Sequence, residues 1–342
     1  MNYTMKAMWR CFSIFLLVLV CSCQSETKSA FYVITGEAQG STYALKYIAE
    51  RERVTQSQID SLLQAFDQSL STYLPDSDIS GWNNGDTLRT LDTFFKETFL
   101  LSQKIYQQTD GLFDPSIGVL VNAYGFGPVK SLPAPPNAKQ LDSLKRFMIF
   151  NELKWLEEGK ISGYRPGVFL DFNAIAQGYS VDVLIAYLQS KGIEDALVEV
   201  GGEIRAIGKN SIEDKSWVIG IDDPIQTPEE RKLIARIALD NLGMATSGNY
   251  RKIKIDPETG ERFVHILNPI TGQSEKNSIL SVTVLAPTAG EADGYATALM
   301  LMRITQIQEW VNRYPGVELL VLYEENGQLK EWETDGFKRL RL

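Results

Sequence analysis

Apolar side chains recur at helical spacing in several separate stretches of the chain, which places them on one face of an amphipathic helix. In one of these, Ile59, Leu63 and Phe66 follow Ser57, a residue suited to cap a helix. The predicted helices cover residues 57–70, 93–108, 172–187 and 290–302, and a shorter one ends at Arg146.

Shorter apolar or alternating runs, separated by Gly, Asn, Asp and Pro, predict strands. The first two flank a glycine-bearing turn at 36–42. Strands greatly outnumber helices and do not alternate with them regularly, which favours an α+β fold, with largely antiparallel sheets and flanking helices, over a doubly wound one. The predicted strands are 31–34, 43–48, 168–170, 196–200, 204–207, 217–221, 234–239, 244–247, 253–255, 263–267, 280–285 and 319–323, with short strands in 147–161.

The helix predicted at 290–302 carries polar side chains that suit a metal. Asp293 and Thr297 are four residues apart, so they share one helix face. A carboxylate and a hydroxyl that point the same way can hold a hard cation such as Mg²⁺ through oxygen. A purely structural reading is also open, in which Glu291 and Asp293 cap the helix and Thr297 bonds to its own turn.

Other candidate residues are individually weak. His265 is the sole histidine and lies between apolar neighbours on a predicted strand, where most histidines are structural. Asp171 ends one predicted strand and opens a helix, so it either caps that helix or lies beside an anion site. Asp114 and Pro115 form a pair typical of turns. None of these residues identifies a reaction by itself.

Composition excludes some classes of function. All three cysteines, Cys11, Cys21 and Cys23, lie near the N-terminus, so the rest of the chain has no thiol for disulfides, zinc or nucleophilic catalysis. The net charge of −9 becomes −11 when Lys6 and Arg10 are removed with the first 22 residues. Such acidity argues against nucleic acid as a partner.

The N-terminus predicts an export signal. Two basic residues precede the apolar run 11–20, which is too short to span a bilayer. Small residues before Cys23 resemble a bacterial lipobox, in which that cysteine is acylated; an uncleaved anchor, or cleavage near Ser22 without a lipid, is the alternative. We expect a signal peptide at 1–22, a tether at 23–30 and one catalytic domain at 31–342. The protein would then be anchored by lipid in the bacterial cell envelope, facing the periplasm or the exterior.

Eight short blocks, taken together, resemble the ApbE-like FAD:protein FMN transferases. They occur in the order typical of that family, between about residue 31 and the C-terminus. The blocks are GEAQGSTY (36–43), STY (71–73), GLFDPS (111–116), DFNAIAQGY (171–179), VGGEIR (200–205), TSGNY (246–250), HILNP (265–269) and ADGYATA (292–298). Lipoproteins are common in the family, in agreement with the N-terminal signal.

The resemblance implies a reaction and a set of site residues. The family cleaves FAD with Mg²⁺, attaches FMN through a phosphoester to a Thr or Ser hydroxyl of an acceptor redox protein, and releases AMP. It implies metal ligation by the backbone oxygen of Ala174 and by Asp293 and Thr297, and it leaves His265 and Asp293 as candidates for the general base. The implied contacts to the flavin or adenine are Gln39, Tyr73, Phe113, Asp114, Pro115, Asp171, Gln177, His265 and Ile266.

Two other functions stay open on the sequence alone. An FAD pyrophosphatase would use water as acceptor and give free FMN and AMP. A non-catalytic flavin-binding lipoprotein would bind FAD without turnover.

Overall fold

The computed structural model describes residues 28–129, 131, 132, 134–223, 232–248, 253–255, 262–264, 266–274 and 277–342. At its centre is an eight-stranded sheet in the order β1-β2-β5-β6-β9-β12-β13-β14. Every strand pairing in these residues is antiparallel, which confirms the predicted α+β class. The sheet consists of β1 (Ala30–Ala38), β2 (Ser41–Ala49), β5 (Asp195–Val200), β6 (Glu203–Ile207), β9 (Gly243–Gly248), β12 (Ile279–Ala286), β13 (Glu318–Glu325) and β14 (Gln328–Glu333).

Helices and three small hairpins surround this sheet. The helices are α2 (Gln56–Leu70), α3 (Asp78–Asn83), α4 (Thr93–Gln108), α5 (Gly118–Ala123), α6 (Ala138–Lys145), α7 (Ala176–Ser190), α8 (Ala289–Leu299), α9 (Ile304–Arg313) and α10 (Asp335–Leu340), with single 3₁₀ turns at Pro115–Ile117 and Phe150–Glu152. The hairpins pair β3 (Lys154–Leu156) with β4 (Lys160–Ser162), β7 (Trp217–Asp222) with β8 (Leu233–Leu239), and β10 (Ile253–Ile255) with β11 (Arg262–Val264).

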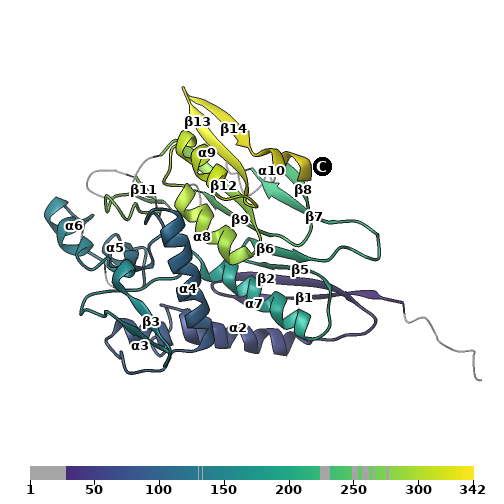
Figure 1. The fold of residues 1–342 in the computed structure, drawn as a ribbon, viewed down its shortest axis with the longest axis horizontal. Helices are drawn as coiled ribbons and strands as arrows, with labels where there is room; N and C mark the ends of the chain where they lie inside the picture. Colours follow the sequence, from purple (N-terminus) through teal and green to yellow (C-terminus); the bar gives the residue numbers. More distant parts are fainter. Residues whose placement is uncertain are drawn as a thin grey trace, which may run out of the picture.

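The two faces of the central sheet are covered differently. Because side chains alternate along a strand, Leu45 and Val198 face α2 and α7. On the other face, Ala206 packs against the β7–β8 hairpin, with Phe337 of α10 closing the cluster. Figure 1 shows α2, α4, α7 and α8 together on one side of the sheet. The helices that carry the predicted site residues therefore lie on a single face.

The predicted helices at 57–70 and 93–108 are confirmed, although Thr55 rather than Ser57 precedes the first of them. The turn between the first two strands is shorter than predicted, because the ladder continues to the pair Ala38 and Ser41. Only Gln39 and Gly40 remain for the turn, with φ of +54° and +69°. Two residues at positive φ match the twist of a tight hairpin.

The strand predicted at 168–170 is wrong. Asn83 forms two side-chain bonds with Leu170, from its Nδ2 to the Leu170 oxygen at 2.9 Å and from the Leu170 N–H to its Oδ1 at 2.7 Å. A side-chain amide thus takes the place of a neighbouring strand. The apolar run 168–170 does not indicate this, because the partner lies far away in the sequence. The helix that follows begins at Ala176 rather than at residue 172, and β11 ends at Val264 rather than at residue 267. α3, α5, α9, α10 and β14 were not predicted from the sequence.

No helix in the described part of the chain is long and apolar enough to cross a bilayer. The predicted signal peptide at 1–22 and Cys23 lie outside the described residues, and the division into signal, tether and catalytic domain stays a prediction.

Candidate functional site

The site is built where the first turns of α7 and α8 touch. A Cβ atom on Gly178 would lie 2.3 Å from the Ala289 carbonyl oxygen and 2.7 Å from the Asp293 Cβ. Separations this short leave no room for a side chain, so glycine lets the two backbones meet. The DFNAIAQGY and ADGYATA blocks, more than 100 residues apart, are thereby brought together.

Asp293 is buried at this contact, with 7% of its surface exposed. Its Oδ2 accepts a hydrogen bond from the Gly178 N–H at 3.1 Å. Burial raises the pKa of Asp293 to about 7, and that hydrogen bond opposes the shift. No lysine or arginine pairs with this carboxylate in the described part of the chain. Among the described residues, burial of this carboxylate is therefore not offset by an ion pair.

The hydrogen bond from Gly178 also involves Ala174. In a continuing α-helix the Gly178 N–H would donate to the carbonyl of Ala174, four residues earlier. It donates to Asp293 instead, so the Ala174 carbonyl is released at the turn that the carboxylate approaches. Thr297 lies one turn along α8, and its Oγ1 is 3.5 Å from the Ser247 Oγ of β9. The structure thus brings the three predicted metal ligands to one region.

These residues form a set of hard oxygen donors: a carboxylate, a hydroxyl and a backbone carbonyl. Such donors suit Mg²⁺. Among the described residues no three His, Cys, Asp or Glu side chains gather as a metal site, so a cation here needs the mixed set. A buried carboxylate that has no lysine or arginine partner among the described residues fits this requirement. His265 lies outside the described residues.

A second group of predicted residues surrounds Asp171. Its backbone N–H donates to the Pro115 oxygen at 2.8 Å, which ties the two segments together. Its carboxylate is 8% exposed and accepts the Asn173 N–H at 2.8 Å. Burial raises the pKa of Asp171. Asn83, which no sequence pattern singled out, holds the preceding residue, Leu170.

Asp114 and Tyr73 lie close to this group. Asp114 accepts the Ser116 N–H at 2.8 Å and the Ser116 hydroxyl at 2.6 Å, and burial raises its pKa to about 6. Burial and the negative charge of Asp171 raise the pKa of Tyr73. Tyr73 is nevertheless 60% exposed, with its hydroxyl 3.4 Å from the Phe126 oxygen. Its ring is therefore free to stack on a planar ligand.

Phe113 and Ile266 are placed differently from Tyr73. Their exposed fractions are 3% and 7%, and both belong to the largest apolar core. Their side chains therefore offer a ligand little surface in this structure.

The two predicted glutamines lie at the start of α7. Gln39 accepts the Ser180 hydroxyl through Oε1 at 3.4 Å, which joins the β1–β2 turn to that helix. The Gln177 side chain lies over the Gly201 backbone, where a Cβ would be 2.4 Å from its Nε2. Polar amides thus flank the helix start from two sides.

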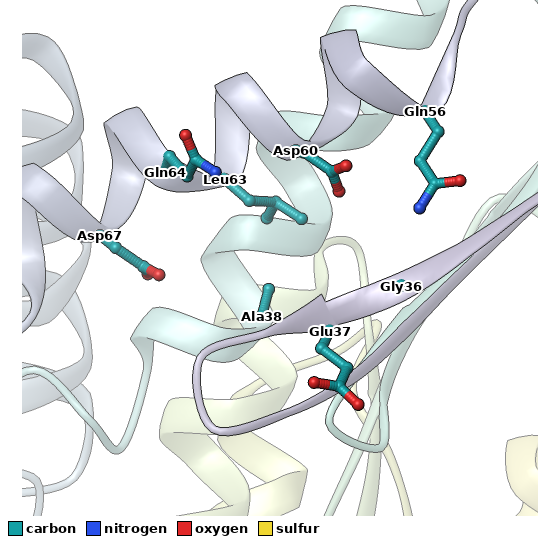
Figure 2. Close-up of a pocket in the computed structure, with 8 residues that line it drawn as sticks. All are labelled: Gly36, Glu37, Ala38, Gln56, Asp60, Leu63, Gln64 and Asp67. Carbon is teal, nitrogen blue, oxygen red and sulfur yellow. The ribbon is translucent and has the colours of Figure 1, made fainter.

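A pocket of about 290 Å³ lies between β1 and α2, next to the Gln39 turn. Figure 2 shows the carboxylates of Asp60 and Asp67 on its α2 side, while the Glu37 side chain, on β1, points away from α2. Burial raises the pKa of Asp67 to about 6, and Gln39 opposes the shift. A pocket of this charge does not favour the phosphates of a nucleotide. The oxygen ligands at the α7–α8 contact are the better candidate site.

Comparisons with known proteins agree on one family. The model of the ApbE family matches residues 39–321. The FAD:protein FMN transferase of Haemophilus influenzae is 33% identical to this chain, over 93% of each. That of Vibrio cholerae is 32% identical, over 94% of this chain and 96% of its own.

Solved structures agree with this in fold. The flavin transferase ApbE from Vibrio cholerae superposes with a TM-score of 0.80 at 30% identity, covering 92% of this chain and all of that one. The apo flavinyl transferase ApbE of Pseudomonas stutzeri gives a TM-score of 0.78 at 28% identity and covers 91% of this chain and 97% of that one.

Proposed function

The chain belongs to the ApbE family, and we propose that it is an FAD:protein FMN transferase that uses Mg²⁺ to cleave FAD and modify an acceptor protein. The acceptor would be a redox protein with a Thr or Ser hydroxyl. The oxygen of that hydroxyl forms a new bond to the phosphorus on the FMN side. The pyrophosphate P–O bond breaks, and AMP leaves with the bridging oxygen.

The environment of Asp293 is the observation that supports this proposal. Asp293 is a buried carboxylate that touches a helix start and has no positive partner among the described residues. Asp293, Thr297 and the Ala174 carbonyl would hold the Mg²⁺. The bound ion would supply Lewis acidity at the pyrophosphate and offset charge on the departing AMP. In a protein of net charge −9, this local positive charge makes an anionic substrate tolerable.

The other residues bind and orient the substrate. The exposed Tyr73 ring offers a stacking surface for one of the flat rings of FAD. Asp171, the Asp114-Pro115 pair and Phe113 form the segment beside it, while Gln39 and Gln177 present amides near α7. His265 and Ile266 complete the proposed contacts. The proton of the acceptor hydroxyl passes to His265 or Asp293, the two candidate bases.

We also propose a place in the cell. The lipobox-like segment ending at Cys23 supports acylation there and an anchor in the bacterial envelope. Replacement of Cys23 by Ala should shift the protein from the membrane fraction to the soluble fraction. Unchanged partitioning of that variant would rule out the lipid anchor.

One assay tests the proposed reaction. The full chain is incubated with FAD, Mg²⁺ and a threonine-bearing acceptor, and the products are read by mass spectrometry. A transferase gives an acceptor heavier by FMN and an equal amount of AMP. Free FMN and AMP without acceptor would identify a pyrophosphatase, and intact FAD in every arm would identify a binding protein. Each of the last two results contradicts the proposal.

A further inference from the structure

Asp182 binds the amino end of α8. It lies in the second turn of α7, and its side chain is only 10% exposed. Its Oδ1 accepts the Ala289 N–H at 3.0 Å, and its Oδ2 accepts the Gly290 N–H at 2.8 Å. The Arg205 Nη1 of β6 donates to the same Oδ1 at 2.7 Å. One carboxylate thus holds the first two N–H groups of the helix that carries Asp293.

The rest of this helix start is also satisfied by the protein. The Thr288 hydroxyl accepts the Glu291 N–H at 3.2 Å, and the Thr288 carbonyl accepts the Ala292 N–H at 3.1 Å. The N–H groups of Ala289, Gly290 and Glu291, the first three residues of the helix, therefore all have partners within the protein. This helix start does not await an anion, so the contacts of Asp182 serve to fix the position of α8.

The first turn of α8 has little room to move otherwise. A Cβ on Gly243 of β9 would lie 2.3 Å from the Ala289 nitrogen, and a Cβ on Gly290 would lie 3.2 Å from the Asp182 Oδ2. The turn is therefore in backbone contact with β9 and close to α7. Asp293 follows Ala289 by one helical turn, so any slippage at Asp182 is transmitted to Asp293.

We propose that Asp182, held by Arg205, is a positioning residue that keeps α8 where Asp293 and Thr297 can ligate the metal. This inference rests on the proposed function, because it assumes that these two residues bind a cation. Asp182 itself touches neither substrate nor metal in this scheme. It acts through the helix, as outer-shell partners of metal ligands do.

The test measures metal affinity directly, with Mn²⁺ as a probe of the full chain and electron paramagnetic resonance as the readout. Asp182→Asn keeps one acceptor oxygen but loses a backbone bond and the ion pair with Arg205. We expect its Kd for Mn²⁺ to rise about 10- to 100-fold. Arg205→Met should weaken binding in the same direction, and Arg205→Lys should restore most of the affinity because it keeps one charged donor. FAD binding without metal, followed by flavin fluorescence, should stay within about twofold.

Glu291 supplies a matched control on the same helix. It is buried and forms an ion pair with Lys104 of α4, away from α7. Glu291→Gln therefore removes a buried charge pair from α8 without touching the contact with α7. Its affinity for Mn²⁺ should stay within about twofold of the parent even if its melting temperature falls.

The possible outcomes distinguish failure of the proposed metal site from failure of the positioning role of Asp182. If Asp293→Asn still binds Mn²⁺ as the parent does, the metal site and the proposed function fail together. If Asp293→Asn loses binding but Asp182→Asn and Arg205→Met keep it, only the positioning role is overturned. Equal losses in Glu291→Gln and Asp182→Asn would also overturn it, since general loosening of α8 would explain both. Should Asp182→Asn fail to fold, Arg205→Met decides the matter.

Discussion

Two aspartates at the α7–α8 contact, Asp293, which is buried, and Asp182, which is partly buried, make the same kind of bond but have different surroundings. Asp182 of α7 accepts N–H groups from the start of α8, and Asp293 of α8 accepts one from the start of α7. Asp182 also has Arg205, which opposes the rise in its pKa caused by burial. Among the described residues Asp293 has one backbone bond to oppose it, and its pKa rises to about 7. Hydrogen bonding alone does not distinguish the proposed scaffold residue from the proposed metal ligand; a positively charged partner among the described residues does.

Asp293→Ala should have the largest effect on activity of the substitutions at this contact. Without the carboxylate the proposed Mg²⁺ loses the charged member of its three proposed protein ligands, and AMP release should fall by at least about 10³-fold. The fold should survive, since the loss of one capping bond costs only about 1 kcal/mol. AMP release and a thermal melt measure the two effects. Full activity in this variant would contradict the role given to Asp293, and Glu291→Gln is the control for a lost acid on the same helix.

Gly178→Ala tests the contact that joins the two aspartates. The added Cβ would meet the Ala289 oxygen at 2.3 Å and the Asp293 Cβ at 2.7 Å, so the helices must separate. We expect a loss of about 2–3 kcal/mol in the free energy of unfolding and a large fall in activity. Urea unfolding measures the first.

Gly192→Ala at the other end of α7 is the control for that substitution. This glycine has a φ of +76° and no neighbouring atom within 4 Å of an added Cβ. It should cost about 1 kcal/mol through backbone strain alone, with activity kept. Equal effects of the two substitutions would mean that the helix contact is not tight.

The raised pKa of Asp293 also predicts that the stability of the metal-free protein depends on pH. The pKa of Asp293 is raised in the folded state, so its contribution is fully present below its unfolded pKa of about 4. That contribution is lost as the pH rises through about 7. The melting temperature of the metal-free protein should therefore fall across this window, and Asp293→Asn should flatten the fall. A slope that is unchanged in Asp293→Asn would show that other groups cause it.

Mg²⁺ should reverse this trend, because the metal binds the ionised carboxylate. Its stabilising effect should grow as the pH approaches neutrality, and a melt series with and without Mg²⁺ at each pH measures it.

Much of this site could be predicted from local sequence, and the rest could not. Helical period alone placed Asp293 and Thr297 on one face, and the resemblance added the Ala174 carbonyl. Asp182 lies within a predicted helix, but its partners are 107 and 108 residues away, so no local pattern marks it. Asn83 is similar, because its bonds to Leu170 span 87 residues. Residues that act through tertiary contacts need the fold before they can be recognised.

Some of the outer elements of the fold were not predicted, for a different reason. The antiparallel class followed from the many short apolar runs. β14 is largely exposed along its length, so it lacks the apolar alternation by which strands were recognised. A weakly buried strand thus leaves a weak pattern in the sequence. α9 is a different case, because Ile304, Ile307 and Val311 recur at helical spacing and its amphipathic pattern is clear.

Thr288→Ala should give the smallest effect on activity, and it distinguishes ordinary helix capping from the contact made by Asp182. Thr288 is the N-cap of α8, and its hydroxyl accepts the Glu291 N–H. Its removal should cost about 1 kcal/mol of stability. Asp182 still holds the two preceding N–H groups, so α8 should stay in place and AMP release should remain within about twofold of the parent. A rise in the Kd for Mn²⁺ as large as that expected for Asp182→Asn would show that ordinary capping positions Asp293. If activity is retained while the melting temperature falls, Asp293 is positioned instead by the contact of Asp182 with the start of α8.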